Sequence, residues 1–330
     1  MSAETGNSCA IIGAGMSGLL AAHKLQEAGW RVTVLDKGRG VGGRMATRRF
    51  GGGSFDHGAQ FFTARSDEFK GMGEGWLEAG AAREWSRGFA DADGNPNEDG
   101  HPRYRGAEGM TSVPKHLARN LDVRAGERVT RVNEDGGTWR LETESGAEVA
   151  ADALIVTAPV PQALEIVGSG GYELPARARE KLEKVSYDPC FALMVLLDGP
   201  SAVPEPGGVQ IKGEPLDWVG DNRLKGISEA PGVTVHAGPR WSEEHFEDDE
   251  AEVTAALLAL ADRFLGGANV VSTQLARWRY SWVSESHPEP CLVAQTEPPL
   301  VFCGDSFAQP KVEGASLSGL AAAGALLGDG

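Results

Sequence analysis

Three glycines, Gly13, Gly15 and Gly18, follow directly after a short apolar segment and constrain this chain more than any other feature. An apolar run, such a turn and then an apolar-periodic segment predict a strand, a tight turn and a helix. Gly13 permits the sharp turn, Gly15 leaves the backbone open to a pyrophosphate, and Gly18 lets the helix lie close to the strand. The amides at the helix N-terminus then face the phosphates.

A second strand is predicted over residues 31–36, and it ends in an acidic side chain. Asp36 stands roughly 20 residues after the glycines, the position from which a carboxylate binds a ribose hydroxyl. This carboxylate would repel a 2′-phosphate. The two segments therefore predict an unphosphorylated adenine dinucleotide, FAD or NAD, on a Rossmann-like α/β domain.

The length of the chain limits the number of domains, and its net charge limits the classes of binding partner. A chain of 330 residues suggests about two domains. The net charge of −16 argues against nucleic acid or an anionic membrane surface as a main partner. We expect no targeting segment at residues 1–6, and the longest apolar stretch, 317–327, is too short to span a bilayer. These features favour a cytoplasmic protein.

The four cysteines show no metal-binding spacing. We expect buried thiols and no metal site. They are Cys9, Cys190, Cys291 and Cys303.

The middle of the chain does not continue a regular alternation of strands and helices. Residues 38–45 are expected to form a loop that brings Arg44 to the pyrophosphate. A glycine and aromatic cluster follows at 51–63, then a helix over 66–90 and a polar turn at 91–100. Another turn and helix start are expected at 109–118.

Strands are predicted further along the chain, with turns between them. Four of them make a β-meander, at 121–123, 128–133, 138–142 and 148–149. A buried strand follows at 153–158. A helix over 249–265 carries core residues at helical spacing, namely Val253, Ala256, Leu257, Leu260 and Phe264. The C-terminal part has a strand at 299–305 ending in Gly304 and Asp305, then a helix of small residues from 312.

Six segments together resemble the flavin-containing amine oxidase superfamily, in which the chain is most similar to the bacterial renalases. They are the glycine turn with Asp36, residues 41–44, the stretch to Phe62, residues 156–159, residues 304–305 and residues 313–316. The resemblance covers nearly the whole chain. It implies a Rossmann-like FAD-binding domain with a β-meander, and a second, α+β substrate domain, as in amine oxidases and p-hydroxybenzoate hydroxylase.

We expect the FAD-binding domain to be discontinuous, with residues 1–70, 105–160 and 285–330. The substrate domain takes 71–104 and 161–284. The covalent flavin cysteine of the monoamine oxidases has no clear counterpart here, and Gly40 stands where many relatives have arginine. The resemblance therefore implies noncovalent FAD.

The same resemblance assigns the residues that contact FAD. The helix that begins near Glu313 points its N-terminus at the flavin pyrimidine carbonyl. The implied FAD contacts are Gly13, Gly15, Met16, Ser17, Gly18, Asp36, Lys37, Gly43, Arg44, Gly58, Ala59, Gln60, Val129, Thr157, Asp305, Glu313, Gly314 and Ala315.

Renalases oxidise the 2- and 6-dihydro isomers of NAD(P)H, and the resemblance implies the same reaction here. Hydride passes to flavin N5, NAD(P)+ forms, and O2 takes the electrons to give H2O2. The reaction needs no strong base, because the dihydropyridine becomes an aromatic cation as hydride leaves. His245, Gln60 and Phe61 are the expected catalytic residues. The expected substrate contacts are Arg240, Trp241, Arg277, Arg279 and Tyr280, whereas His57 is expected to be structural.

Three other functions stay open. An amine oxidase or desaturase of the same superfamily is the first, and Lys311 beside Glu313 keeps amine oxidation open. A dinucleotide-binding redox sensor without turnover is the second. An NAD-dependent dehydrogenase is the third, although the C-terminal Gly304 and Asp305 favour a flavin. The isomer preference, the NAD or NADP skeleton and the oligomeric state are not specified by the sequence.

Overall fold

The computed structural model describes residues 7–211 and 213–329, in two compact units. Unit 1 comprises Met1–Gly43, Pro114–Ser186 and Val283–Gly330, and unit 2 comprises Arg44–Val113 and Tyr187–Trp282. Residues 1–6, where we expected no targeting segment, lie outside the described residues. Compared with the expected domains, residues 44–70 and 105–113 fall in unit 2, and residues 161–186 and 283–284 fall in unit 1. Which ligand each domain binds remains a prediction.

A six-stranded sheet forms the centre of unit 1, in the order β17-β18-β11-β1-β2-β7. The strands are β1 (Ser8–Ile12), β2 (Arg31–Asp36), β7 (Asp122–Ala125), β11 (Ala153–Val156), β17 (Leu292–Thr296) and β18 (Pro299–Phe302). All neighbours pair in parallel except β17 and β18. The apolar runs in β1 and β11 are buried, as expected for central parallel strands.

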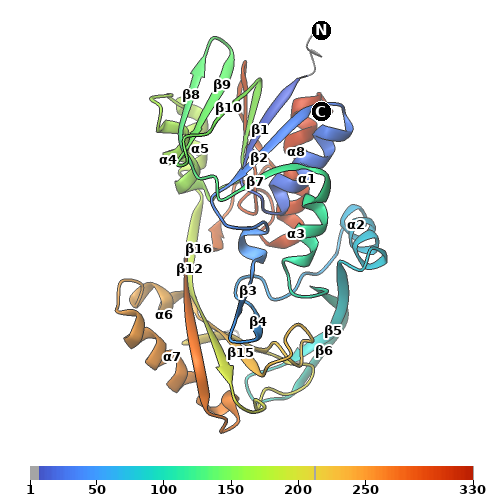
Figure 1. The fold of residues 1–330 in the computed structure, drawn as a ribbon, viewed down its shortest axis with the longest axis vertical. Coiled ribbons are helices and arrows are strands. Elements are labelled where there is room, and N and C mark those ends of the chain that lie inside the picture. The colour runs from blue at the N-terminus through green and yellow to red at the C-terminus, as the bar shows by residue number, and fades with distance from the viewer. Residues whose placement is uncertain (1–6, 212, 330) are drawn as a thin grey trace. The chain divides into compact units, whose positions relative to one another are not determined.

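Two long helices of unit 1 lie side by side (Figure 1). They are α1 (Met16–Glu27), which follows the glycine turn, and α8 (Lys311–Leu327). The first and the last helix therefore pack against each other, and α8 supports the glycine turn that precedes α1.

The rest of unit 1 is a β-meander with short helices. The meander consists of β8 (Val129–Asp135), β9 (Thr138–Thr143) and β10 (Glu148–Ala151). The helices are α4 (Val160–Gly168), α5 (Ala176–Leu182) and the 3₁₀ turn Ala118–Asn120. The 3₁₀ turn Gly43–Met45 and the helix α3 (Ser112–Leu117) each include residues of both units. Residues 121–123 were predicted to belong to the meander, which is wrong. Residues 122 and 123 belong instead to β7, which pairs with the open edge of β2.

Unit 2 is built on a seven-stranded sheet in the order β16-β12-β15-β14-β13-β5-β6. The strands are β5 (Ala82–Ala90), β6 (Pro96–Gly106), β12 (Ser186–Leu197), β13 (Gly208–Gln210), β14 (Leu216–Asp221), β15 (Gly232–Ala237) and β16 (Val270–Glu285). The other elements are the hairpin β3 (Thr47–Phe50) and β4 (Gly53–Asp56), and the helices α2 (Asp67–Glu78), α6 (Pro239–Glu244) and α7 (Glu250–Leu265). The hairpin occupies part of the glycine and aromatic cluster at 51–63.

The predicted helix over 66–90 is wrong in its second half. Ser66 caps α2 by accepting a hydrogen bond from Phe69 N, and the helix ends at Glu78, before Gly80 with φ of +69°. Residues 82–90 are strand β5, because pairing with β6 outweighs the local helical pattern. The predicted turn at 91–100 is correspondingly shorter, since β6 starts at Pro96.

The predicted helix at 249–265 is confirmed as α7. The Asp249 carboxylate accepts a hydrogen bond from Ala251 N at the start, and Gly266 adopts φ of +71° at the end. Val253, Leu257 and Phe264 are buried in the core of unit 2, as expected. Leu260 was expected there too, but it is 37% exposed.

Candidate functional site

The glycine turn between β1 and α1 has the geometry that the sequence predicts. Gly13 adopts φ of +112°, and a Cβ there would lie 2.2 Å from Thr157 Oγ1. A Cβ on Gly18 would lie 1.9 Å from the Gly13 carbonyl oxygen. The conformation of the turn therefore requires glycine at both positions.

Gly15 differs from its two neighbours. Its φ is −81°, and a Cβ there would meet no described atom within 4 Å beyond its chain neighbours. Packing within the described chain therefore does not demand glycine at this position. The open space at the N-terminus of α1 fits a pyrophosphate, the group expected there.

The Asp36 carboxylate at the end of β2 joins the turn to the following loop. Its Oδ2 accepts a hydrogen bond from Ala14 N at 2.6 Å, and its Oδ1 accepts one from Gly38 N at 2.6 Å. The loop also returns to the turn, since Gly42 N donates to the Ala14 carbonyl at 2.8 Å. Each carboxylate oxygen has a further lone pair available for a ribose hydroxyl. Asp36 therefore has a structural role in addition to its predicted one.

Three more of the expected FAD contacts in unit 1 lie around this turn. Thr157 Oγ1 donates to the Ile12 carbonyl at 3.0 Å, and a Cβ on Gly43 would lie 3.9 Å from Gly15 Cα. Lys37 Nζ donates to Gln162 Oε1 at 3.1 Å, and partial burial lowers the pKa of Lys37. Val129 is buried at the start of β8, and its contact with FAD stays a prediction.

The N-terminus of α8 is fixed against α1. Ser17 Oγ donates to the Ala315 carbonyl at 2.5 Å, and a Cβ on Gly314 would lie 1.7 Å from the Gln309 carbonyl oxygen. Ala308, before the helix, adopts φ of 56°, and Lys311, the first residue of α8, adopts φ of 89°; both conformations are unfavourable for residues other than glycine. Met16, Ser17, Glu313, Gly314 and Ala315 are therefore parts of one helix pair, with Asp305 in the loop that leads to α8.

A loop in unit 2, residues 56–60, holds the backbone of Arg44. Ala59 N donates to the Arg44 carbonyl at 2.8 Å, and a Cβ on Gly58 would lie 2.0 Å from the same oxygen. Gln60 is buried, and its Nε2 donates to the Asp56 carbonyl at 2.6 Å. The predicted FAD contacts Arg44, Gly58, Ala59 and Gln60 are thus brought together.

Aromatic rings surround the end of this loop. The Phe61 ring centroid lies 5.1 Å from that of Phe89 and 5.8 Å from that of Trp218. Two buried polar atoms, Gln60 Oε1 and Trp218 Nε1, have no hydrogen-bond partner among the described residues. Such orphaned atoms are uncommon in folded proteins and are frequent where a ligand or an ordered water binds.

Two buried histidines lie beside Gln60. Burial lowers the pKa of His57 to about 4, assisted by the charge of Arg48, and lowers the pKa of His236 to about 3. His57 stacks on Trp278 with 5.2 Å between ring centroids, which is consistent with the predicted structural role. Both imidazoles are neutral at pH 7 and carry no charge to the site.

The loop that carries His245 is held by the arginines of β16. Arg277 donates to the Phe246 and Asp248 carbonyls, each at 2.6 Å, and Arg279 pairs with Glu247 at 2.8 Å. His245 Nδ1 lies 2.6 Å from an Asp248 carboxylate oxygen.

The remaining expected substrate contacts have mixed surroundings. The ring of Trp241 lies 4.3 Å from that of His245. Glu214 accepts hydrogen bonds from the backbone amides of Arg240 and Trp241, whereas the Arg240 side chain is exposed. The Tyr280 carbonyl accepts a hydrogen bond from Arg44. Arg277 and Arg279 thus have partners within the protein, and their binding to substrate stays a prediction.

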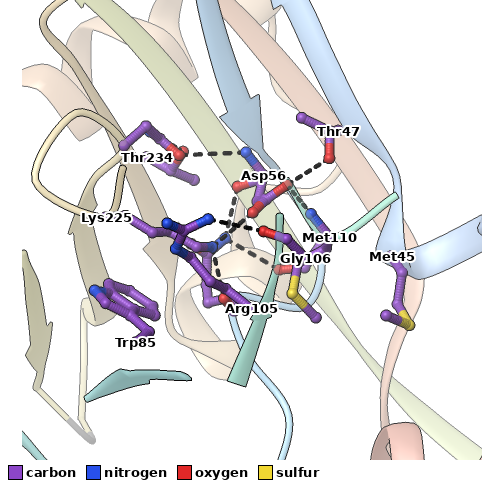
Figure 2. A network of polar contacts seen from close by, with 12 residues as sticks. Met45, Thr47, Asp56, Trp85, Arg105, Gly106, Met110, Lys225 and Thr234 are labelled. Atoms are coloured by element: carbon purple, nitrogen blue, oxygen red, sulfur yellow. Dashed lines mark hydrogen bonds and ion pairs between the residues drawn. The ribbon is translucent and has the colours of Figure 1, made fainter. Parts of the chain in front are cut away.

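The residue that sequence analysis missed is Lys225. Its ammonium is buried against Asp56, in the network that Figure 2 shows. Asp56 lies in a segment that was singled out, but nothing near Lys225 in the sequence indicated a role.

Comparison with known proteins places these sites in a family. The flavin-containing amine oxidoreductase family matches residues 66–327, and an NAD(P)-binding Rossmann-like domain matches residues 11–72. The chain belongs to the flavin-containing amine oxidoreductase family. It is therefore an FAD-dependent oxidase, and the predicted cofactor and fold class are confirmed.

Individual relatives agree with this membership. Renalase from Mus musculus is 26% identical, over 94% of this chain and 96% of its own length, which confirms the expected resemblance. A mutant of putrescine oxidase has a TM-score of 0.74 at 17% identity, covering 98% of this chain and 100% of that chain. A putative protoporphyrinogen oxidase from Exiguobacterium sp. 255-15 also has a TM-score of 0.74, at 14% identity, covering 100% of this chain and 99% of that chain. These two solved structures share the fold.

Among the described residues, no helix is both long and apolar enough to cross a membrane.

Proposed function

We propose that this oxidase acts on dihydronicotinamide dinucleotides that carry hydride at ring position 2 or 6. Its products are NAD(P)+ and, with O2 as acceptor, H2O2. The observation that carries the proposal is the similarity to renalase, which extends over 94% of this chain and 96% of the relative.

When bound, FAD would supply the hydride acceptor for this reaction, with O2 as the final electron acceptor. The residues that would hold it in unit 1 are the glycine turn, Asp36 and the N-terminus of α8. Gly15 leaves the backbone accessible to the pyrophosphate, and the amides at the start of α1 and α8 donate to anionic groups. In unit 2, Arg44 and the loop 56–60 are the proposed contacts.

His57 and His236 are weak bases because burial lowers their pKa, which suits a reaction that needs no strong base. A dihydropyridine releases hydride without first losing a proton, so His57 and His236 have no proton to accept. Amine oxidation generally requires the amine to be neutral. A base would therefore have to deprotonate an amine substrate. The buried Lys225 is not that base, because its ammonium is paired with the Asp56 carboxylate and donates to the Gln60 carbonyl. His245 Nδ1 lies 2.6 Å from an Asp248 carboxylate oxygen, and we propose that its other ring nitrogen binds the substrate amide.

The test is an anaerobic mixing experiment with the FAD-loaded protein. Ordinary NADH, an isomer mixture of dihydro-NAD, the corresponding NADP forms and a panel of amines are each mixed with it, and flavin absorbance is followed. We expect rapid bleaching by the 2- or 6-dihydro isomers alone, with peroxide on re-aeration. Bleaching by amines would assign an amine oxidase instead. A protein that none of them reduces would favour the redox sensor.

A further inference from the structure

A lysine ammonium is buried in unit 2 at the loop of residues 56–60. The Lys225 side chain is 1% exposed and its partner Asp56 is 0% exposed, with 2.6 Å between Nζ and Oδ2. The same Nζ donates to the Gln60 carbonyl at 2.5 Å and lies 4.8 Å from the centre of the Trp85 ring. Figure 2 shows the ammonium between Asp56 and Trp85. One charged group therefore joins the first and last residues of the loop.

Both partners of the ion pair are fixed from other sides. Asp56 Oδ1 accepts hydrogen bonds from Thr47 Oγ1 at 2.6 Å and from Met110 N at 2.8 Å (Figure 2). The Lys225 backbone N donates to the Asp221 carbonyl at 2.9 Å, in a turn that the Asp221 side chain also caps. Desolvation lowers the pKa of Lys225, and the Asp56 carboxylate opposes this effect. The ammonium thus has a defined place on a rigid turn.

Packing alone does not account for a lysine here. Removing two charges from water is costly, and apolar residues of similar volume often stabilise a core at least as well as a buried ion pair. An ammonium differs from an apolar side chain because it donates directed hydrogen bonds, here to a carboxylate and to a backbone carbonyl. Both acceptors, the Asp56 carboxylate and the Gln60 carbonyl, belong to the loop of residues 56–60. The ammonium therefore fixes the conformation of this loop.

That loop contains residues expected to contact FAD. Ala59 N binds the Arg44 carbonyl, Gly58 lies against the same oxygen, and the Gln60 side chain crosses back to the Asp56 carbonyl. We propose that Lys225 is a positioning residue for FAD, which holds residues 56–60 and the Arg44 backbone in the conformation that the flavin requires. The inference rests on the FAD cofactor of the proposed function and on this loop contacting FAD, and it is independent of the substrate.

Three variants of the full chain test the proposal. Lys225→Met removes the ammonium, and the double variant Asp56→Asn, Lys225→Met also removes the charge that would be left unpaired. Val253→Ala is the matched control, because it opens a cavity in the core at α7 of the same unit without touching the loop. For each, the measurements are hydrogen exchange of residues 53–63 in the apoprotein, the dissociation constant of FAD, the visible spectrum of bound FAD and the melting temperature.

We expect amide exchange in residues 53–63 to become at least tenfold faster in both Lys225 variants. The dissociation constant of FAD should rise at least tenfold, and the flavin absorption bands should shift. Val253→Ala should lower the melting temperature while leaving the loop exchange and the spectrum unchanged. If the single variant does not fold, the double variant decides, since it leaves no unpaired charge.

Two results would overturn the proposal. One is a double variant with wild-type loop exchange, FAD affinity and spectrum. The other is a Val253→Ala variant that loses as much FAD affinity as the Lys225 variants at the same melting temperature, because a purely structural role would then suffice. A wild-type protein that binds FAD but ignores dihydronicotinamides would refute only the proposed substrate, and the comparison of variants would still decide the role of Lys225.

Discussion

The three glycines of the turn between β1 and α1 have different roles: two are required for folding, and one is proposed to give the cofactor access. A side chain at Gly13 or Gly18 collides with described atoms at 2.2 Å or less, whereas one at Gly15 enters open space. Folding and cofactor binding can therefore be separated by substitution at single positions, in line with the separate roles that the spacing of the three glycines predicts.

We predict that Gly15→Ala leaves the apoprotein as stable as the wild type but weakens FAD binding at least tenfold. The methyl group fits the fold but occupies the space needed by the pyrophosphate. Melting of the apoprotein and titration with FAD measure the two effects. Gly75→Ala is the control, since it also meets no described atom within 4 Å but lies in α2, away from the proposed contacts. Equal FAD affinity in Gly15→Ala and Gly75→Ala would remove Gly15 from the site.

Site residues were predictable where their chemistry is local in sequence. The glycines and Asp36 lie within 24 residues of one another, and the hydrogen bond between Asp36 and Ala14 spans 22 positions. Lys225 and Asp56 are separated by 169 positions, and no periodic pattern relates them. The partners of Arg277 and Arg279 were missed for the same reason, because a guanidinium is equally suited to a phosphate and to a backbone carbonyl.

At the scale of elements, strong local patterns predicted the first strand, the turn, α7 and α8. Predictions from the sequence were wrong where the pairing of a strand with a distant strand decides the secondary structure. Residues 82–90 became a strand because β6 lies beside them, and β7 became an edge of the parallel sheet because β2 offered free backbone groups. Strand propensity depends on such neighbours more than helix propensity does.

The contact between α1 and α8 gives a prediction about helix packing. A Cβ on Gly319 would lie 2.1 Å from the Ser17 carbonyl oxygen, which is backbone and has little freedom to move. Gly319→Ala should therefore separate the helices and lower the free energy of unfolding by about 1–3 kcal/mol, the usual cost of overpacking. It should also weaken FAD binding, because both helix N-termini are proposed FAD contacts. Urea unfolding and FAD titration are the measurements.

Gly324→Ala in the same helix is the matched control. A Cβ there would lie 3.0 Å from Lys24 Nζ, the mobile end of a long side chain. We expect it to unfold at the wild-type urea concentration or slightly above, since alanine favours the helix more than glycine does. If Gly319→Ala behaved like Gly324→Ala, the close packing of α1 and α8 would not be required for stability.

For the whole molecule, the buried histidines predict how stability depends on pH. The unfolded state takes up protons on His57 and His236 near the ordinary pKa of 6.5, whereas the folded state does so only near pH 4 and pH 3. Between these values the unfolded state binds more protons, so the free energy of unfolding falls as the pH falls. The stability is complete above pH 6.5. At pH 5 the loss is about 2 kcal/mol for each histidine.

We therefore expect the apoprotein to lose stability steadily between pH 7 and pH 5, before most carboxylates are protonated. In His236→Gln and in His57→Gln the slope of the unfolding free energy against pH should be clearly less steep than in the wild type, because one imidazole with a lowered pKa is removed. His101→Gln changes an exposed histidine and should leave the slope unaltered. Urea unfolding at pH 7, 6 and 5 provides the slopes. Parallel slopes for the wild type, His236→Gln and His57→Gln would mean that both buried imidazoles accept protons in the folded state, and the assignment of neutral imidazoles beside Gln60 would then be wrong.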